Sequence, residues 1–172
     1  MSIIVETGTG DAAAESYAAV ADADLYHANR GNVAWAALTT TVKEQMLRLA
    51  SDYMVEAYRG RWKGYRSQTL QALDWPRKSV ILTDMSINYQ IPFYQIPAEV
   101  INAQVELALR AAVLGAGTLA PDLEQGVVSE SVSGIGTVYD RFSPQYTRYR
   151  QVDMMLRHLL ASSGAMTQLG RS

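Results

Sequence analysis

The chain has 172 residues, with 15 lysines and arginines against 17 aspartates and glutamates, and a formal net charge of −2 at pH 7. This length suits one domain with a core of its own. The near-neutral balance excludes a protein that coats nucleic acid with its whole surface, because that mode needs a strongly basic chain. Cysteine is absent, so disulfides, a thiolate nucleophile and Cys-ligated zinc are also excluded.

The two ends of the chain differ in composition from its middle. Residues 1–16 are rich in Gly, Thr, Ala and Asp, which is typical of an extended arm, and Ile3 to Val5 suits an edge strand. The first five residues lack the basic flank and length of a signal peptide, and no stretch approaches the roughly 18 apolar residues of a membrane span. We expect one domain at 17–161, a flexible tail at 162–172, and a cytosol-like compartment.

Two helices are predicted in the first third of the domain. The first runs from near Val20 to Arg30 and places His27 on its polar face. The second runs from a capping box formed by Thr41 and Glu44 to about Tyr58, with Lys43 in solvent. The expected apolar faces are Ala21, Leu25 and Ala28 in the first helix, and Val42, Met46, Leu49, Ala50, Tyr53 and Ala57 in the second.

The second half of the chain predicts two more helices around a hairpin. A third helix begins near Pro97 and runs through Val100 to Leu114. Its polar strip is narrow, so we expect the helix to be central in the fold. Glu106 and Arg110 are expected to form an ion pair on this exposed strip. Residues 127–139 alternate around Ser133-Gly134 as in a β-hairpin. A last helix starts between Pro144 and Arg150, with Tyr149, Val152, Met155, Leu156 and Leu159 on one face. The fold class is therefore mainly α: a small bundle of about four helices with a β-hairpin and extended termini.

Chemistry-bearing patterns are missing from the sequence. His27 and His158 belong to no HxxxH or HExxH pattern, and we interpret both as ordinary helix histidines. The glycine pairs at 8–10 and 134–136 lack the third glycine of a nucleotide-binding loop, and no Gly-x-Ser-x-Gly elbow is present. We expect a protein that is not an enzyme and that has neither cofactor nor metal.

Positive charge and aromatic residues concentrate in one segment. Aromatics and arginine are enriched in interface cores and in nucleic-acid grooves, so this segment is the candidate contact surface. For the two tryptophans an alternative interpretation, as ordinary core anchors, is equally favoured. The candidate residues are Arg59, Arg61, Trp62, Lys63, Tyr65, Arg66, Trp75, Arg77 and Lys78.

Several of these motifs, in this order, resemble a family of tailed-phage and prophage proteins whose members are often labelled DnaT-like single-stranded-DNA-binding proteins. The resemblance covers about Val5 to Ala112. It is carried by Ala21-Asp22-Ala23-Asp24-Leu25-Tyr26-His27, Arg30-Gly31-Asn32, Trp35, Lys43-Glu44-Gln45, Asp52-Tyr53, Tyr58-Arg59-Gly60-Arg61-Trp62-Lys63-Gly64, Gln71-Ala72-Leu73-Asp74-Trp75-Pro76-Arg77 and Ile96-Pro97.

The layout also resembles the helical head-tail connectors, or adaptor proteins, that form a ring beneath the phage portal. In that group, helices are followed by a β-loop and a closing helix that ends in Leu-Leu, as Val152 to Leu160 does here. This resemblance implies a ring of about twelve copies with heterologous contacts. It implies contacts with the portal protein and a tail-side neck or terminator protein, and duplex DNA passing through the channel.

Under this hypothesis the protein is made in the host bacterial cytoplasm and lies at the head-tail junction of the virion, where the tail residues Met166, Leu169 and Arg171 contact the portal. We favour it because a slightly acidic ring lets duplex DNA slide, whereas a strongly basic one would retain it. Two alternatives remain. One is a replication protein that stacks single-stranded DNA on Trp62, Tyr65 and Trp75, and the other is a different head-completion or tail-terminator component.

Overall fold

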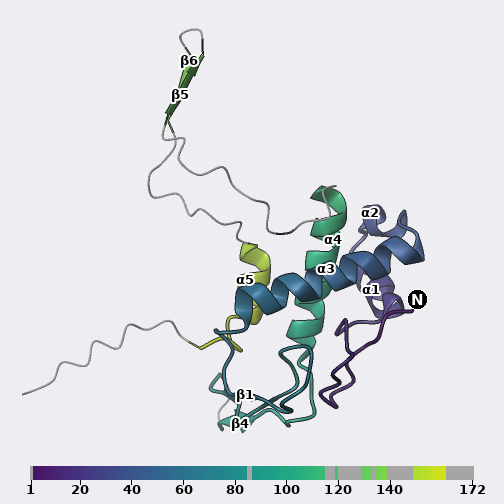
Figure 1. The fold of residues 1–172 in the computed structure, drawn as a ribbon, viewed down its shortest axis with the longest axis vertical. Helices are drawn as coiled ribbons and strands as arrows, with labels where there is room; N and C mark the ends of the chain where they lie inside the picture. Colours follow the sequence, from purple (N-terminus) through teal and green to yellow (C-terminus); the bar gives the residue numbers. More distant parts are fainter. Residues whose placement is uncertain are drawn as a thin grey trace, which may run out of the picture.

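The computed structural model describes residues 2–84, 87–114, 119, 129–132, 135–138 and 149–161. These residues form a mainly α-helical fold with a β-hairpin, as the sequence predicts, and with two further two-stranded antiparallel ladders (Figure 1). None of the described helices is both long enough and apolar enough to cross a membrane. The tail residues Met166, Leu169 and Arg171 lie outside the described part of the chain.

Two long helices form the centre of the fold. α3 (Thr40–Tyr58) crosses α4 (Ala98–Leu114), and this pair makes the most extensive contact between helices (Figure 1). α5 (Arg150–Leu156) packs against α4, and α1 (Val20–Ala28) and α2 (Val33–Ala36) cover the start of α3. The central position predicted for the third helix is therefore confirmed, whereas the sequence did not predict α2.

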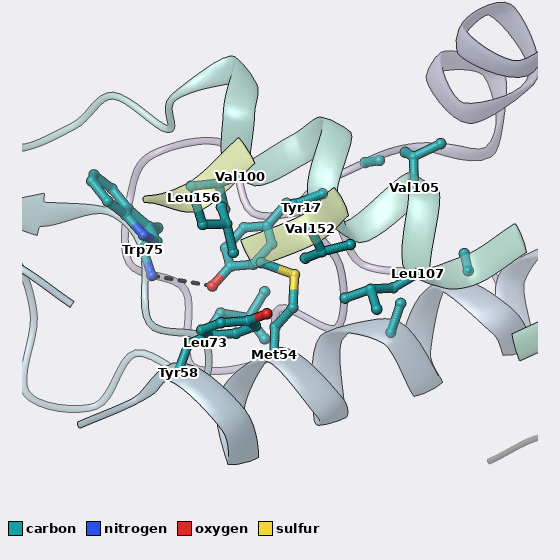
Figure 2. Close-up of a cluster of buried hydrophobic side chains, with 14 of the residues drawn as sticks. Tyr17, Met54, Tyr58, Leu73, Trp75, Val100, Val105, Leu107, Val152 and Leu156 are labelled. Carbon is teal, nitrogen blue, oxygen red and sulfur yellow. Dashed lines mark hydrogen bonds between the residues drawn. The ribbon is translucent and has the colours of Figure 1, made fainter. Parts of the chain in front are cut away.

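The core lies between α3, α4, α5 and two loops. Figure 2 shows Met54 and Tyr58 of α3 facing Val100 of α4 and Val152 and Leu156 of α5. Tyr17, Leu73 and Trp75 close this cluster from the loops. The apolar face predicted for the last helix is confirmed, since Tyr149, Val152, Leu156 and Leu159 are buried and Met155 packs against the core.

The buried face of α3 differs from the predicted one by about one residue. The fully buried residues are Lys43, Leu47, Ala50, Ser51, Met54 and Tyr58, whereas the predicted stripe, Ala50 apart, is half-buried. Lys43 is buried because its ammonium binds the Asp24 carboxylate at 2.8 Å. The predicted cap is also wrong: the helix begins after Thr39, whose hydroxyl accepts a hydrogen bond from the Val42 amide at 3.4 Å.

The face predicted for the first helix is wrong for a similar reason. Ala23, Tyr26 and His27 are buried, whereas Leu25 is 63% exposed. His27 is buried because both ring nitrogens have partners, the Val105 carbonyl at 3.2 Å and the Asn32 side chain at 3.0 Å. Polar residues with specific partners therefore replace the aliphatic face that periodicity predicts.

The ion pair predicted on α4 is present, but one of its two residues is buried. The Arg110 guanidinium binds the Glu106 carboxylate at 2.8 Å, as predicted. Glu106 is nevertheless buried, because it also accepts a hydrogen bond from the Tyr26 hydroxyl at 3.0 Å. The pair therefore helps to attach α1 to α4.

The predicted hairpin is confirmed within residues 127–139. β5 (Ser129–Val132) pairs antiparallel with β6 (Ile135–Val138), so that Ser129 faces Val138 and Val132 faces Ile135. Figure 1 shows the two strands standing away from the helices, and their contacts are chiefly with each other.

The N-terminal arm folds back on the helices instead of extending. Val5 makes a parallel bridge to Ser16, and the buried Glu6 carboxylate accepts hydrogen bonds from the amides of Gly8, Gly10 and Asp11. The amides of Tyr17 and Ala18 then donate to the side-chain oxygen of Gln104 on α4. The arm is thus folded on itself, and its end is tied to α4.

Residues 61–84 and 87–95 form what we call the β end. In it, β1 (Tyr65–Arg66) pairs with β2 (Arg77–Lys78), and β3 (Ile81–Leu82) pairs with β4 (Tyr89–Gln90). The chain after α5 joins it, because the Lys63 amide donates to the Leu159 carbonyl and the Ala161 amide to the Arg61 carbonyl. The sequence did not predict these short strands.

Candidate functional site

The candidate residues divide into those that build the β end and those that it exposes. Trp62 is 5% exposed and Trp75 is fully buried, with their rings edge to face at 5.8 Å. The structure therefore places both where the core-anchor interpretation predicts. In this conformation neither ring is available to a DNA base or to another subunit.

A buried carboxylate organises this region. Asp74 is 1% exposed and accepts hydrogen bonds from Arg59 at 2.8 Å and from the Trp62 indole at 3.1 Å. Its backbone amide and that of Trp75 both donate to the Tyr17 hydroxyl; Figure 2 shows the second of these bonds. Arg59 therefore supports the fold, and its charge is neutralised by Asp74.

Arg77 is buried at the β1–β2 ladder, where its guanidinium hydrogen-bonds to backbone carbonyls. It is 6% exposed, and its guanidinium donates to the carbonyls of Lys63 at 2.8 Å, Gly64 at 2.7 Å and Asp74 at 3.1 Å. Burial lowers the pKa of this guanidinium from its ordinary value. Of the candidate arginines, Arg59 and Arg77 are therefore committed to internal bonds.

A glycine allows the close approach of β1 to β2. Gly64 has a φ of +65°, and a Cβ built there would lie 2.1 Å from the Lys78 carbonyl oxygen. Only glycine fits such a position, since it has no side chain and adopts positive φ freely. Tyr65 and Lys78 are then directly opposite each other in the ladder, so their side chains lie on the same face.

The exposed candidates are Tyr65, Arg61, Arg66 and Lys78. Tyr65 is 75% exposed, and the Arg61 guanidinium lies 4.0 Å from the Asp153 carboxylate and 5.2 Å from the centre of the Tyr58 ring. Arg66 and Lys78 are exposed and pair with no carboxylate of the described residues. Lys63 is half-buried, and its ammonium contacts the carbonyls of His158 at 2.8 Å and Ile81 at 3.5 Å.

Sequence reasoning missed the other exposed hydrophobic residues of the β end. Twelve large hydrophobic side chains are exposed among the described residues, and seven of them belong to the β end: Tyr65, Leu70, Ile81, Ile87, Tyr89, Phe93 and Tyr94. The Ser67 hydroxyl holds the last pair in place by donating to the Phe93 carbonyl at 2.6 Å. The run Tyr89-Gln-Ile-Pro-Phe-Tyr, with its aromatics around a proline, was the available signal.

Charge and apolar surface therefore coincide at the β end. The β end contains five basic side chains but only Asp74 and Asp84 as acids, and Asp74 is bound to Arg59 of the preceding segment. Such a surface has two possible uses: aromatic and arginine residues bury well in protein interfaces, and aromatic faces beside cations bind single-stranded nucleic acid. Among the described residues, no group of three or more His, Asp or Glu side chains has the arrangement of a metal site.

Comparison with known proteins gives one match. A family model described as "Putative DnaT-like ssDNA binding protein" matches residues 1–172, the whole chain. No curated protein and no solved structure matches.

Proposed function

The chain belongs to the family described as putative DnaT-like ssDNA-binding proteins, and from the geometry of this member we propose that it is a structural subunit that assembles into a ring, the connector between the portal and the tail of a tailed phage. The observation that carries this proposal is the β end, where seven large hydrophobic side chains are exposed beside Arg66 and Lys78, which form no ion pair with a described carboxylate. Exposed apolar surface of this kind typically marks a protein interface.

Two further features support assembly. The order α4, hairpin, α5 is the order of helix, β-loop and closing helix that the resemblance to adaptor proteins implies. An isolated two-stranded hairpin is marginally stable in water, so a neighbouring subunit is the natural partner of β5 and β6. In a closed ring each subunit presents two different patches to its two neighbours, and the β end supplies one of them.

The proposal includes the location and partners of the ring. It lies at the head-tail junction of the virion, between the portal and a tail-side neck or terminator protein, in about twelve copies. Duplex DNA passes through its channel. The slightly acidic net charge of −2 suits this passage, because few phosphate contacts form and sliding stays fast.

Quantitative mass spectrometry of purified virions, with the portal protein as internal standard, tests the connector. We expect about one copy per portal subunit. Virions of a phage that carries Arg66→Glu with Lys78→Glu are expected to lack the protein. The control is Val113→Ala, a change at an exposed position of α4, which is expected to leave incorporation unchanged. Absence of the wild-type protein from virions, with abundance in infected cells, would remove the connector function.

The second candidate function is single-stranded-DNA binding, which the family description favours directly. Of the three stacking residues expected from the sequence, Tyr65 is exposed, whereas Trp62 and Trp75 are buried. Tyr65 opposite Lys78 is the arrangement that supports this function: a base stacks on the tyrosine, and the ammonium on the same face contacts a phosphate.

Fluorescence anisotropy with labelled oligo-dT tests this second candidate. Stacking is worth about 1–3 kcal/mol per base, so Tyr65→Ala is expected to weaken binding by at least about fivefold, with Val113→Ala as the matched control. Tight binding at physiological salt that depends on Tyr65 would make single-stranded-DNA binding the favoured function in place of the connector. Weak binding, found only at low salt and equal in both variants, would remove it.

A further inference from the structure

The β end needs a partner that suits both its apolar and its charged residues. Tyr65, Leu70 and Ile87 are 75–80% exposed, so the fold itself covers little of this surface. Lys63, Arg66 and Lys78 lie among them and form no ion pair with a described carboxylate. A complementary partner therefore carries acidic groups next to partly exposed hydrophobic ones.

The chain itself presents a surface of this kind. On α3, Glu44, Arg48, Asp52 and Glu56 follow one another at intervals of four residues, so they form one row along the helix. Glu15 of the N-terminal arm lies beside this row, where it binds Arg48 at 3.0 Å. We call Glu15, Glu44, Asp52 and Glu56 the acidic row.

One cation is shared among these four carboxylates. Arg48 contacts Glu15 at 3.0 Å and Glu44 at 3.9 Å, whereas Asp52 and Glu56 are exposed and form no ion pair with a described residue. Burial, followed by the nearby Glu15 charge, raises the pKa of the Asp52 carboxyl. The row thus carries uncompensated negative charge, which a cation from outside would relieve.

Hydrophobic side chains flank the row. Leu49 and Tyr53 precede Asp52 and Glu56 by three residues, which places them next to the row on the helix surface. Both are half-buried; the Tyr53 ring packs edge to face on Tyr58 and Tyr149, and part of the Leu49 side chain is exposed beside the row. The outer surface of α3 therefore combines carboxylates with apolar groups, the composition that complements the β end.

We propose that the β end of one copy docks on the acidic row of α3 in a second copy, where Lys78, from the ladder face that it shares with Tyr65, and Arg66, from the other face, bind Asp52 and Glu56. The two faces differ, so the contact is heterologous: a copy bound through its β end still offers its acidic row to the next copy. This inference rests on the proposed connector function, because it names the contact by which the ring closes. It is nevertheless testable on the purified full chain.

Charge reversal and its rescue test the contact. One variant carries Arg66→Glu and Lys78→Glu, and the other carries Asp52→Lys and Glu56→Lys. Sedimentation velocity is expected to show assembly of the wild type at low ionic strength and at least about tenfold weaker association of each variant alone, since like charges then face each other. An equimolar mixture is expected to regain assembly, because each reversed face meets an oppositely charged one.

A matched control and three outcomes make the test decisive. Arg30→Glu with Arg150→Glu changes the net charge by the same amount at two exposed helix-end positions, and it is expected to assemble like the wild type. Circular dichroism verifies that every variant folds. A wild type that stays monomeric at low ionic strength, single variants that assemble unchanged, or a mixture that stays monomeric would each overturn the contact.

The failure of this contact and that of the connector function give different results. If purified protein assembles through these residues but is absent from virions, the connector function is lost and the contact stands. If the protein is stoichiometric in virions but charge reversal has no effect on assembly, the connector function stands and the ring closes through other surfaces.

Discussion

His27 illustrates how single residues in this fold depend on exact partners. It is 1% exposed, its Nε2 lies 3.2 Å from the Val105 carbonyl, and its Nδ1 lies 3.0 Å from the Asn32 side-chain nitrogen. The carbonyl can only accept a hydrogen bond, so Nε2 carries the proton and donates it, and Nδ1 accepts a hydrogen bond from the Asn32 amide. The fold therefore requires a neutral imidazole.

Stability is expected to fall at acidic pH because of this histidine. Burial lowers the pKa of His27, while Glu106 and Asp24 act against that shift and Arg30 adds to it. The unfolded chain protonates this histidine near its ordinary pKa of about 6.5, whereas the folded protein does so only at lower pH. The contribution of His27 to stability is therefore fully present above about pH 6.5 and is lost as the pH falls below it. Urea unfolding of wild type and His27→Gln at pH 8 and pH 5.5 measures this. An identical pH dependence in both proteins would contradict it.

Gln104 is the second residue whose loss we expect to be costly. It is fully buried; its oxygen accepts from the Tyr17 and Ala18 amides, and its nitrogen lies 2.7–3.0 Å from oxygens of Ser16, Leu47 and Ser51. Gln104→Leu removes the acceptor of the buried Tyr17 amide and one of the two acceptors of the Ala18 amide, so we expect a loss of about 2–4 kcal/mol in the free energy of unfolding. Gln45→Leu on exposed α3 surface is the control, expected within about 0.5 kcal/mol of the wild type. Equal effects would be evidence against the network.

At the scale of elements, the sequence predicted the positions of the helices better than it predicted which face of each helix is buried. α4 and the hairpin follow the predicted ranges because long aliphatic periodicity and a Ser-Gly turn are local signals. The faces of α1 and α3 differ because His27 and Lys43 are buried by partners far away in the sequence. The β end was not predicted at all, since its ladders of two residues each depend on tertiary contacts such as those of Arg77.

Gly64 offers a test of the β end as an element. An alanine there would require a left-handed φ and place Cβ against the Lys78 carbonyl, so β1 must move away from β2. We expect Gly64→Ala to lower the free energy of unfolding by about 1–3 kcal/mol. Gly60→Ala is the matched control: nothing lies within 4 Å of its Cβ, and we expect at most about 1 kcal/mol of change. Chemical unfolding that ranks the two variants equally would refute the strained geometry.

At the scale of the whole molecule, the distribution of aromatic residues separates core from surface. All three tryptophans are buried, with Trp35, Trp62 and Trp75 at most 5% exposed, whereas tyrosines and a phenylalanine form the exposed aromatic surface of the β end. The sequence identified the segment that carries the surface, and the structure assigns exposure to different aromatics within it. Because the tryptophans are buried and the tyrosines are exposed, the fluorescence response expected on binding single-stranded DNA also changes.

Intrinsic tryptophan fluorescence is therefore expected to respond weakly to single-stranded DNA. Stacking of a base on an indole quenches its emission, and no indole of this fold is open to a base. Titration with oligo-dT is expected to leave the tryptophan emission maximum and intensity essentially unchanged, even where anisotropy detects binding through Tyr65. Strong quenching that Trp62→Phe abolishes would mean that the β end opens to bring Trp62 to the surface. In that case the proposal that DNA meets only the tyrosines would fail, and single-strand binding would become the leading function.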